Sequence, residues 1–114
     1  METVTVTIGR NVGDDPLPAD QWNAFTSDTR AAVEAATLDL WAIAPYKGVW
    51  KGTTEDAAIF YGPLVDVGEV LEALRQRLAV LATYYGQEAV GLSVGTGELV
   101  EHFATDVPSV EGAR

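Results

Sequence analysis

Alternating apolar and polar residues open the chain and predict a β-strand there. In "TVTVTI", residues 3–8, Val4, Val6 and Ile8 point to one side and the threonines to the other. Successive side chains of a strand face opposite ways, so this pattern indicates a strand buried on one face. Three further strands are predicted at "TLDLWAIA" (37–44, resuming after Pro45 and Gly48 as "VWK"), "AAIFYG" (57–62) and "EAVGLSVG" (88–95).

Apolar residues at helical spacing predict two helices between these strands. The first helix covers about residues 18–36 and the second about 67–85. Asp66 and Glu69 fit a capping box at the start of the second helix. The side chains expected on the buried faces are Trp22, Phe25, Thr29, Ala32, Val33, Ala36, Val67, Val70, Leu71, Leu74, Leu78 and Leu81.

The order β-α-β-β-α-β predicts an α+β, ferredoxin-like sandwich. Its four-stranded antiparallel sheet carries both helices on one face, in the strand order 4-1-3-2. Strand 2 is then an edge, which suits Pro45 because proline lacks the N–H that a central strand needs. One domain is expected over residues 1–104, with a flexible C-terminal tail over 105–114. In "TGELVEHF" the fourth strand either extends or returns as a short fifth strand.

The sheet face without helices is the predicted interaction surface. If residues 52–56 form the hairpin turn, Trp50 and Phe60 share this open face, with Trp41 beside them. The residues then expected in the core are Val49 and Ile59. A slip of one residue would reverse these positions, and Trp50 would pack inside the protein instead. Because exposed aromatic patches are typical of partner surfaces, we predict a homodimer through the open sheet face.

Charge and composition restrict the partners. The chain has 114 residues, a formal net charge of −10 and no cysteine. The negative charge repels phosphates, so direct nucleic-acid binding is not expected, whereas an acidic mimic of nucleic acid stays open. Disulfides and thiolate metal sites are excluded. Neither a membrane-spanning run nor a signal peptide is evident, so the sequence predicts a cytoplasmic protein without a membrane partner.

The sequence carries no recognisable catalytic, cofactor or metal motif. His102 is the one histidine, and the neighbouring carboxylates are too loosely spaced to indicate a metal site. Glu55 and Asp56 are interpreted as turn formers, as are Asp14 and Asp15. No catalytic, cofactor-binding or metal-binding residue is therefore predicted, and a non-enzymatic protein is favoured.

Charged and polar residues near the hairpin complete the candidate interaction surface. Arg10 and Asn11 follow the first strand and are placed to meet an anionic group. Lys47 and Lys51 flank Trp50, while plain surface charge is the alternative explanation for all four. The candidate surface consists of Trp41, Trp50, Phe60, Lys47, Lys51, Arg10 and Asn11.

Two stretches resemble a family of small uncharacterised bacterial and actinobacteriophage proteins. The first is "TVTIGRNVGDDPLPADQWNAF", a strand ending in Gly9–Arg10, then a loop and a helix with Trp22 and Phe25. The second is the kinked strand around Gly48-x-Trp50. The resemblance covers residues 3–25 and about 48–61, departs near Pro45, and implies a ferredoxin-like fold with no established activity.

Three functions are weighed from these observations. The leading hypothesis is an acidic protein-interaction module, an accessory phage protein that binds a host protein. The second is an enzyme or small-ligand module resembling dimeric α/β-barrel proteins, with a site between helices and sheet near Arg10, Trp50, Tyr61 and His102. The third is a nucleic-acid mimic, which requires carboxylates lined up on one face.

Overall fold

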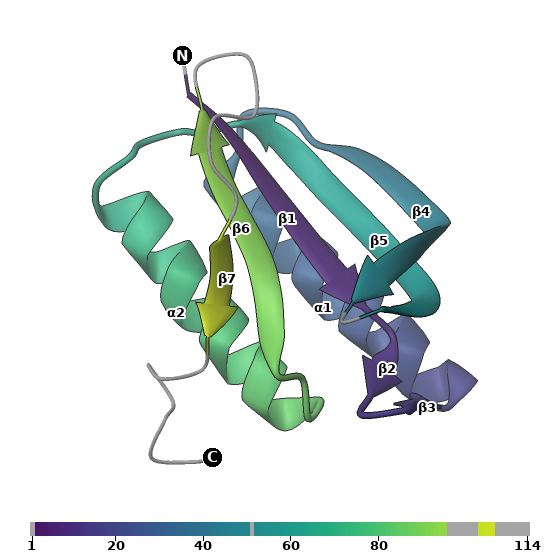
Figure 1. Cartoon of the computed structure of the whole chain (residues 1–114). Helices are drawn as coiled ribbons and strands as arrows, with labels where there is room; N and C mark the ends of the chain where they lie inside the picture. The colour runs from purple at the N-terminus through teal and green to yellow at the C-terminus, as the bar shows by residue number, and fades with distance from the viewer. Residues whose placement is uncertain (1, 51, 96–102, 107–114) are drawn as a thin grey trace.

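Two helices cover one face of a five-stranded antiparallel sheet in the computed structural model, which describes residues 2–50, 52–95 and 103–106 (Figure 1). The helices are α1 (Ala19–Ala36) and α2 (Glu69–Tyr84). The sheet order is β4-β5-β1-β6-β7, formed by β4 (Trp41–Trp50), β5 (Thr53–Pro63), β1 (Thr3–Gly9), β6 (Ala89–Gly95) and β7 (Phe103–Asp106). The predicted ferredoxin-like α+β fold and its central strand order are confirmed.

Two details of the strand plan differ from the prediction. The short strand β7 pairs with β6, so β6 is an inner strand and not an edge. Strand β7 includes Thr105 and Asp106, which lie beyond the predicted domain boundary at 104. Residues 107–114 lie outside the described residues. The segment expected to be a plain loop after β1 forms a small hairpin of β2 (Asn11–Val12) and β3 (Asp15–Pro16).

The core lies between the sheet and the helices, as the alternation in β1 predicts. Val4, Val6 and Ile8 are each at most 1% exposed. Phe25 on α1 and Leu78 on α2 pack against them without exposure to solvent. The periodic apolar residues of both helices thus form the inner layer of the protein.

Tyr85, just after α2, ties the two helices together. Its ring stacks on Phe25 with 4.7 Å between ring centres, and its hydroxyl donates a hydrogen bond to Asp28 at 2.7 Å. Burial, followed by this hydrogen bond, raises the pKa of Tyr85 to about 12.

The start of α2 corrects the predicted capping box. Gly68 is the residue that caps the helix, and Asp66 instead accepts a hydrogen bond from the Gly68 N–H at 3.1 Å. Val67, expected on the buried face, is 55% exposed because the helix begins two residues after it, at Glu69.

The β4–β5 hairpin also has a different register from the predicted one. Trp50 pairs with Thr53, so the connection is residues 51–52 instead of 52–56. Gly52 has a φ of 80°, a conformation that favours glycine and closes two-residue hairpins. The shorter turn shifts β5 against β4, and facing assignments based on the longer turn change with it.

This shift reverses the positions of several hairpin side chains. Phe60 pairs with Val6 and is only 3% exposed, so it belongs to the core and not to the open face. Val49, expected in the core, is 73% exposed. Ile59 pairs with Thr7 on the open face. β4 nevertheless is the predicted edge strand, with an irregularity in its pairing between Ile43 and Tyr46.

Candidate functional site

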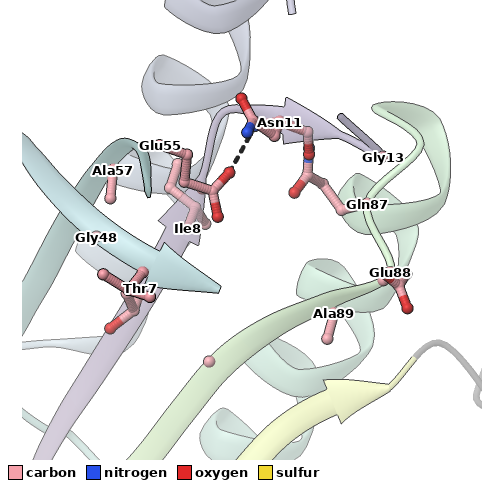
Figure 2. Close-up of a pocket in the computed structure, with 13 residues that line it drawn as sticks. Thr7, Ile8, Asn11, Gly13, Gly48, Glu55, Ala57, Gln87, Glu88 and Ala89 are labelled. Atoms are coloured by element: carbon pink, nitrogen blue, oxygen red, sulfur yellow. Dashed lines mark hydrogen bonds between the residues drawn. The ribbon is translucent and has the colours of Figure 1, made fainter. Parts of the chain in front are cut away.

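A pocket of about 190 Å³ opens at the end of β1, on the sheet face without helices. β1, β5 and β6 contribute to its floor, and the hairpin end of β4, the β2–β3 hairpin and the segment before β6 enclose it (Figure 2). The open face is thus hollowed at one end. The lining residues are Thr7, Ile8, Gly9, Asn11, Gly13, Gly48, Val49, Glu55, Ala57, Gln87, Glu88, Ala89 and Gly91.

Glu55, on β5, is a carboxylate of this pocket that the backbone holds in place. Its Oε1 accepts a hydrogen bond of 2.6 Å from the backbone N–H of Asn11, drawn as a dashed line in Figure 2. The carboxylate also lies directly over Gly9, where a Cβ atom would approach Oε2 to 2.5 Å. A backbone donor and a residue without a side chain therefore determine where this negative charge lies.

An ion-pair cluster beside Glu55 anchors the same part of β5. Arg10 donates to Asp56 Oδ2 at 3.0 Å and, through Nε, to the Leu17 carbonyl at 2.8 Å. Lys47 on β4 pairs with the other oxygen of Asp56. The hydrogen bond from Lys47, followed by that from Arg10, holds the pKa of Asp56 below its ordinary value. This cluster joins β4, β5 and the end of β1.

Gln87 connects the opposite wall of the pocket to the β2–β3 hairpin. The side chain is 6% exposed, and its amide donates to the Asn11 carbonyl at 3.3 Å. Asn11 is therefore held from both sides, by Glu55 at its N–H and by Gln87 at its carbonyl. Figure 2 shows Glu88 and Ala89 on the wall beyond Gln87, away from Glu55.

Two acidic side chains line the pocket. Glu55 and Glu88 are both among its lining residues, whereas the described lining contains neither lysine nor arginine. The whole chain adds to this field with its net charge of −10. Among the residues with described placement, no group of three metal-ligating side chains is close enough to hold a metal ion.

The structure separates the predicted interaction residues. Asn11 lines the pocket, whereas Arg10 and Lys47 are engaged by Asp56 beside it. Trp41 lies farther along the open face, 48% exposed and stacked on Tyr61 with 5.7 Å between ring centres. Phe60 is in the core. Lys51, His102 and the side chain of Trp50 lie outside the described part of the chain.

The pocket lies elsewhere than the site that the sequence suggests for an enzyme, between helices and sheet near Arg10, Trp50, Tyr61 and His102. The pocket is on the sheet face without helices, while His102 and the side chain of Trp50 lie outside the described residues, so that site stays a prediction. One interpretation made from the sequence is wrong. Glu55 and Asp56 are strand residues and not turn formers. Gly52 was the available signal, because a short glycine turn there extends the following strand backward through both carboxylates.

The sequence and the fold were compared with known proteins. No protein-family model matches the chain, and no curated protein matches it as a relative. A solved structure of a phage SAM lyase in the apo state has a TM-score of 0.61 and 20% identity, over 90% of this chain and 86% of that one. A phage SAM lyase in complex with S-methyl-5'-thioadenosine has a TM-score of 0.60 and 18% identity, over 90% and 87% of the two chains.

These similarities show a shared fold and correct the leading functional hypothesis. The neighbours are enzymes, one with a small ligand bound, so the findings contradict the prediction of a protein-interaction module and favour the alternative of an enzyme or small-ligand protein. The resemblance to phage proteins is supported in part, by fold and without a matching family model. Within the described residues, no helix is long and apolar enough to cross a membrane.

Proposed function

We propose that this protein binds S-adenosylmethionine (SAM) and cleaves a carbon–sulfur bond in it, releasing S-methyl-5'-thioadenosine. The observation that carries the proposal is a pocket in which a backbone N–H holds the Glu55 carboxylate, on a fold shared with a phage SAM lyase. SAM has a sulfonium, an ammonium and a carboxylate, and its net charge is positive. A ligand of this charge matches the acidic pocket of an acidic protein, whereas a phosphorylated cofactor would be repelled.

The energetics of cleavage indicate which positive group Glu55 holds. When the carbon–sulfur bond breaks, its electron pair goes to sulfur, and the sulfonium becomes a neutral thioether. A carboxylate beside sulfur would stabilise the substrate more than the transition state and would slow the reaction. The ammonium keeps its charge throughout. We therefore assign Glu55 to the ammonium, where its attraction acts equally before and during cleavage.

The reaction requires no added water, because a lyase breaks the bond without hydrolysis. Both products therefore come from the substrate alone. As the carbon–sulfur bond breaks and its electron pair goes to sulfur, the carbon forms a bond with the carboxylate oxygen of the same SAM molecule, which gives a lactone and S-methyl-5'-thioadenosine. The protein's contribution is then to hold the substrate in a productive shape, as a positioned carboxylate and a narrow pocket do.

The size of the pocket indicates how SAM is accommodated. Its volume of about 190 Å³ is below the roughly 300–1,000 Å³ of typical ligand pockets. The pocket therefore holds one end of the ligand, and the other end extends along the open sheet face. Thr7 and Gly91, which pair across β1 and β6, form the floor where such an extension begins, and neither side chain is large.

Product analysis tests this function. Purified protein is incubated with SAM, and S-methyl-5'-thioadenosine is measured by liquid chromatography and mass spectrometry. We expect product from the wild type and at least a tenfold loss in Glu55→Gln, because the variant loses the charged partner of the ammonium. Glu34→Gln, an exposed change on α1, is the control with the same change in charge.

Two outcomes of this assay would contradict the proposal. One is the absence of product from folded wild-type protein at millimolar SAM, together with no SAM binding by calorimetry. The other is equal activity in Glu55→Gln and Glu34→Gln, which would remove Glu55 from the site. Product formation with a changed Michaelis constant and little change in kcat would support binding of the ammonium.

The phage origin, the cytoplasmic location and the homodimer are further parts of this proposal. A phage protein acting on SAM in the cytoplasm of its host fits the phage origin of the structural neighbours. The homodimer through the open sheet face stays a prediction, and it shares that face with the pocket. Light scattering with and without SAM measures whether the two compete.

A further inference from the structure

We infer that Gly9 is a positioning residue for the Glu55 carboxylate, so that the last residue of β1 determines where the pocket holds positive charge. The inference rests on the proposed function for the identity of the ligand, but the placement of the carboxylate itself is independent of it. Gly9 touches no ligand in this scheme. It acts through Glu55 by leaving the volume that the carboxylate occupies.

The geometry around Gly9 leaves no space for a side chain. A Cβ atom at this position would lie 2.5 Å from Oε2, 2.6 Å from Cδ and 2.7 Å from Oε1 of Glu55. Carbon and carboxylate atoms do not approach so closely without displacement. The three nearest atoms all belong to this one carboxyl group, so Glu55 alone accounts for the nearest conflict.

Backbone conformation does not explain the glycine. The described glycines with positive φ are Gly13, Gly52 and Gly86, and Gly9 is not among them. Gly9 is an ordinary strand residue that pairs with Ala57, a position where glycine weakens a sheet because it packs no side chain. An alanine is therefore allowed by the backbone, and the contact with Glu55 becomes the specific reason for glycine.

The backbone near Gly9 is held from several sides, so the carboxylate is the part that moves when a methyl group is added. The next N–H, of Arg10, donates to the Asp56 carbonyl at 2.9 Å, and the Arg10 side chain is tied to Asp56 and Leu17. The Glu55 carboxylate, by contrast, is the end of a flexible side chain. Gly9→Ala is thus expected to keep the fold while breaking the Asn11 N–H hydrogen bond.

A double-mutant cycle on SAM binding tests the positioning role. Gly9→Ala, Glu55→Ala and the double variant are compared by calorimetry with SAM. We expect Gly9→Ala to weaken binding about tenfold, in the range of a lost charge-assisted interaction, and to have no further effect in the Glu55→Ala background. The double variant is the matched control, because it carries the same methyl group without the carboxylate. Equal losses in both backgrounds would overturn the inference.

A second measurement needs no ligand and separates this inference from the proposed function. The chemical shift of the Asn11 amide proton in the nuclear magnetic resonance spectrum reports its hydrogen bond to Glu55. We expect this resonance to move in Gly9→Ala to the position that it takes in Glu55→Ala, because both variants lose that bond. An Asn11 resonance that stays at its wild-type position in Gly9→Ala, or an unfolded Gly9→Ala protein, would refute the positioning role. If Gly9→Ala shows this shift but the wild type binds no SAM, the proposed function fails and the role of Gly9 stands.

Discussion

The two faces of the central sheet contrast in composition and in task. On the helix-covered face, Val4, Val6 and Ile8 of β1 are excluded from solvent by two apolar helix stripes. On the open face of the same strand, Thr7 and Gly9 line a pocket with a fixed carboxylate. One strand therefore supplies core packing with one set of positions and a polar site with the set between them.

This contrast implies a division between stability and function. Burial of apolar side chains on the helix face stabilises the fold, while glycine, threonine and glutamate on the open face contribute little to it. Substitutions in a site composed of such residues should therefore change the free energy of unfolding only slightly. The predictions below use substitutions on each face, in order of decreasing effect on the free energy of unfolding.

Phe25→Ala, on the helix side, is expected to have the largest effect. The side chain has no exposed surface and packs on both Tyr85 and Trp22, so its removal leaves a cavity. The expected loss is about 3–5 kcal/mol of unfolding free energy. Urea denaturation measures it. A loss below about 1 kcal/mol would break the comparison, since the helix face would then not carry the stability.

Tyr85→Phe removes one hydrogen bond from the same region and keeps the ring. The loss of the bond to Asp28 is expected to cost about 1 kcal/mol at neutral pH. The raised pKa of Tyr85, about 12, also predicts a pH dependence. Between pH 10 and 12 the unfolded chain releases a proton that the folded protein keeps, so stability contributed by Tyr85 falls as pH rises.

Urea midpoints measured from pH 8 to 11 check this dependence. The wild type is expected to lose stability more steeply than Tyr85→Phe over this range. Parallel curves for the two proteins would show that the phenol is not held in its neutral form by burial.

Asp56→Asn tests the ion-pair cluster next to the pocket. The pKa of Asp56 is lowered by Lys47 and Arg10, so its stabilising contribution is present above the ordinary value of 3.8 and is lost as pH falls below it. Because the cluster is solvent-accessible, we expect a small effect that is weakened further by salt. Urea midpoints at pH 3 and pH 6 should differ less in Asp56→Asn than in the wild type. Glu34→Gln is the control, and an equal flattening there would contradict the assignment.

Thr7→Val, on the open face, is expected to have the smallest effect on stability. The two side chains have similar volume, and strand positions favour valine, so the change should stay within about 0.5 kcal/mol. Because Thr7 lines the pocket, the same variant is expected to weaken SAM binding severalfold. Calorimetry and urea denaturation on one preparation give both values. A stability loss larger than that of Tyr85→Phe would erase the contrast between the faces.

The helix-covered half of the molecule was predictable because local pattern and burial agree there. The period-two alternation of β1 and the helical stripes of α1 and α2 each indicate the buried side without knowledge of the partner element. Phe25 and Leu78 were placed in the core in this way. The element order then restricted the topology to the ferredoxin-like arrangement. The fifth strand, β7, only extended the sheet beside β6.

The candidate site was not predictable because it depends on register and on distant contacts. The position of Phe60 changed with the length of one turn, and local propensity alone does not determine that length. The position of the Glu55 carboxylate depends on its hydrogen bond with Asn11, 44 residues away, and on the space that Gly9 leaves. Gly52 was a usable signal for the turn and the strand after it, but nothing in the sequence places a carboxylate over Gly9.

The sequence by itself thus determined the fold, the buried faces of β1 and the two helices, and the net negative charge. The fold and the buried faces follow from the local periodicity of apolar residues, and the net charge follows from a sum over residues. Neither depends on which distant segments contact one another. Only the tertiary structure brought the end of β1, the β4–β5 hairpin and the start of β6 around one pocket and left Glu55 fixed within it. Those contacts join segments far apart in the chain, and their geometry is a property of packing.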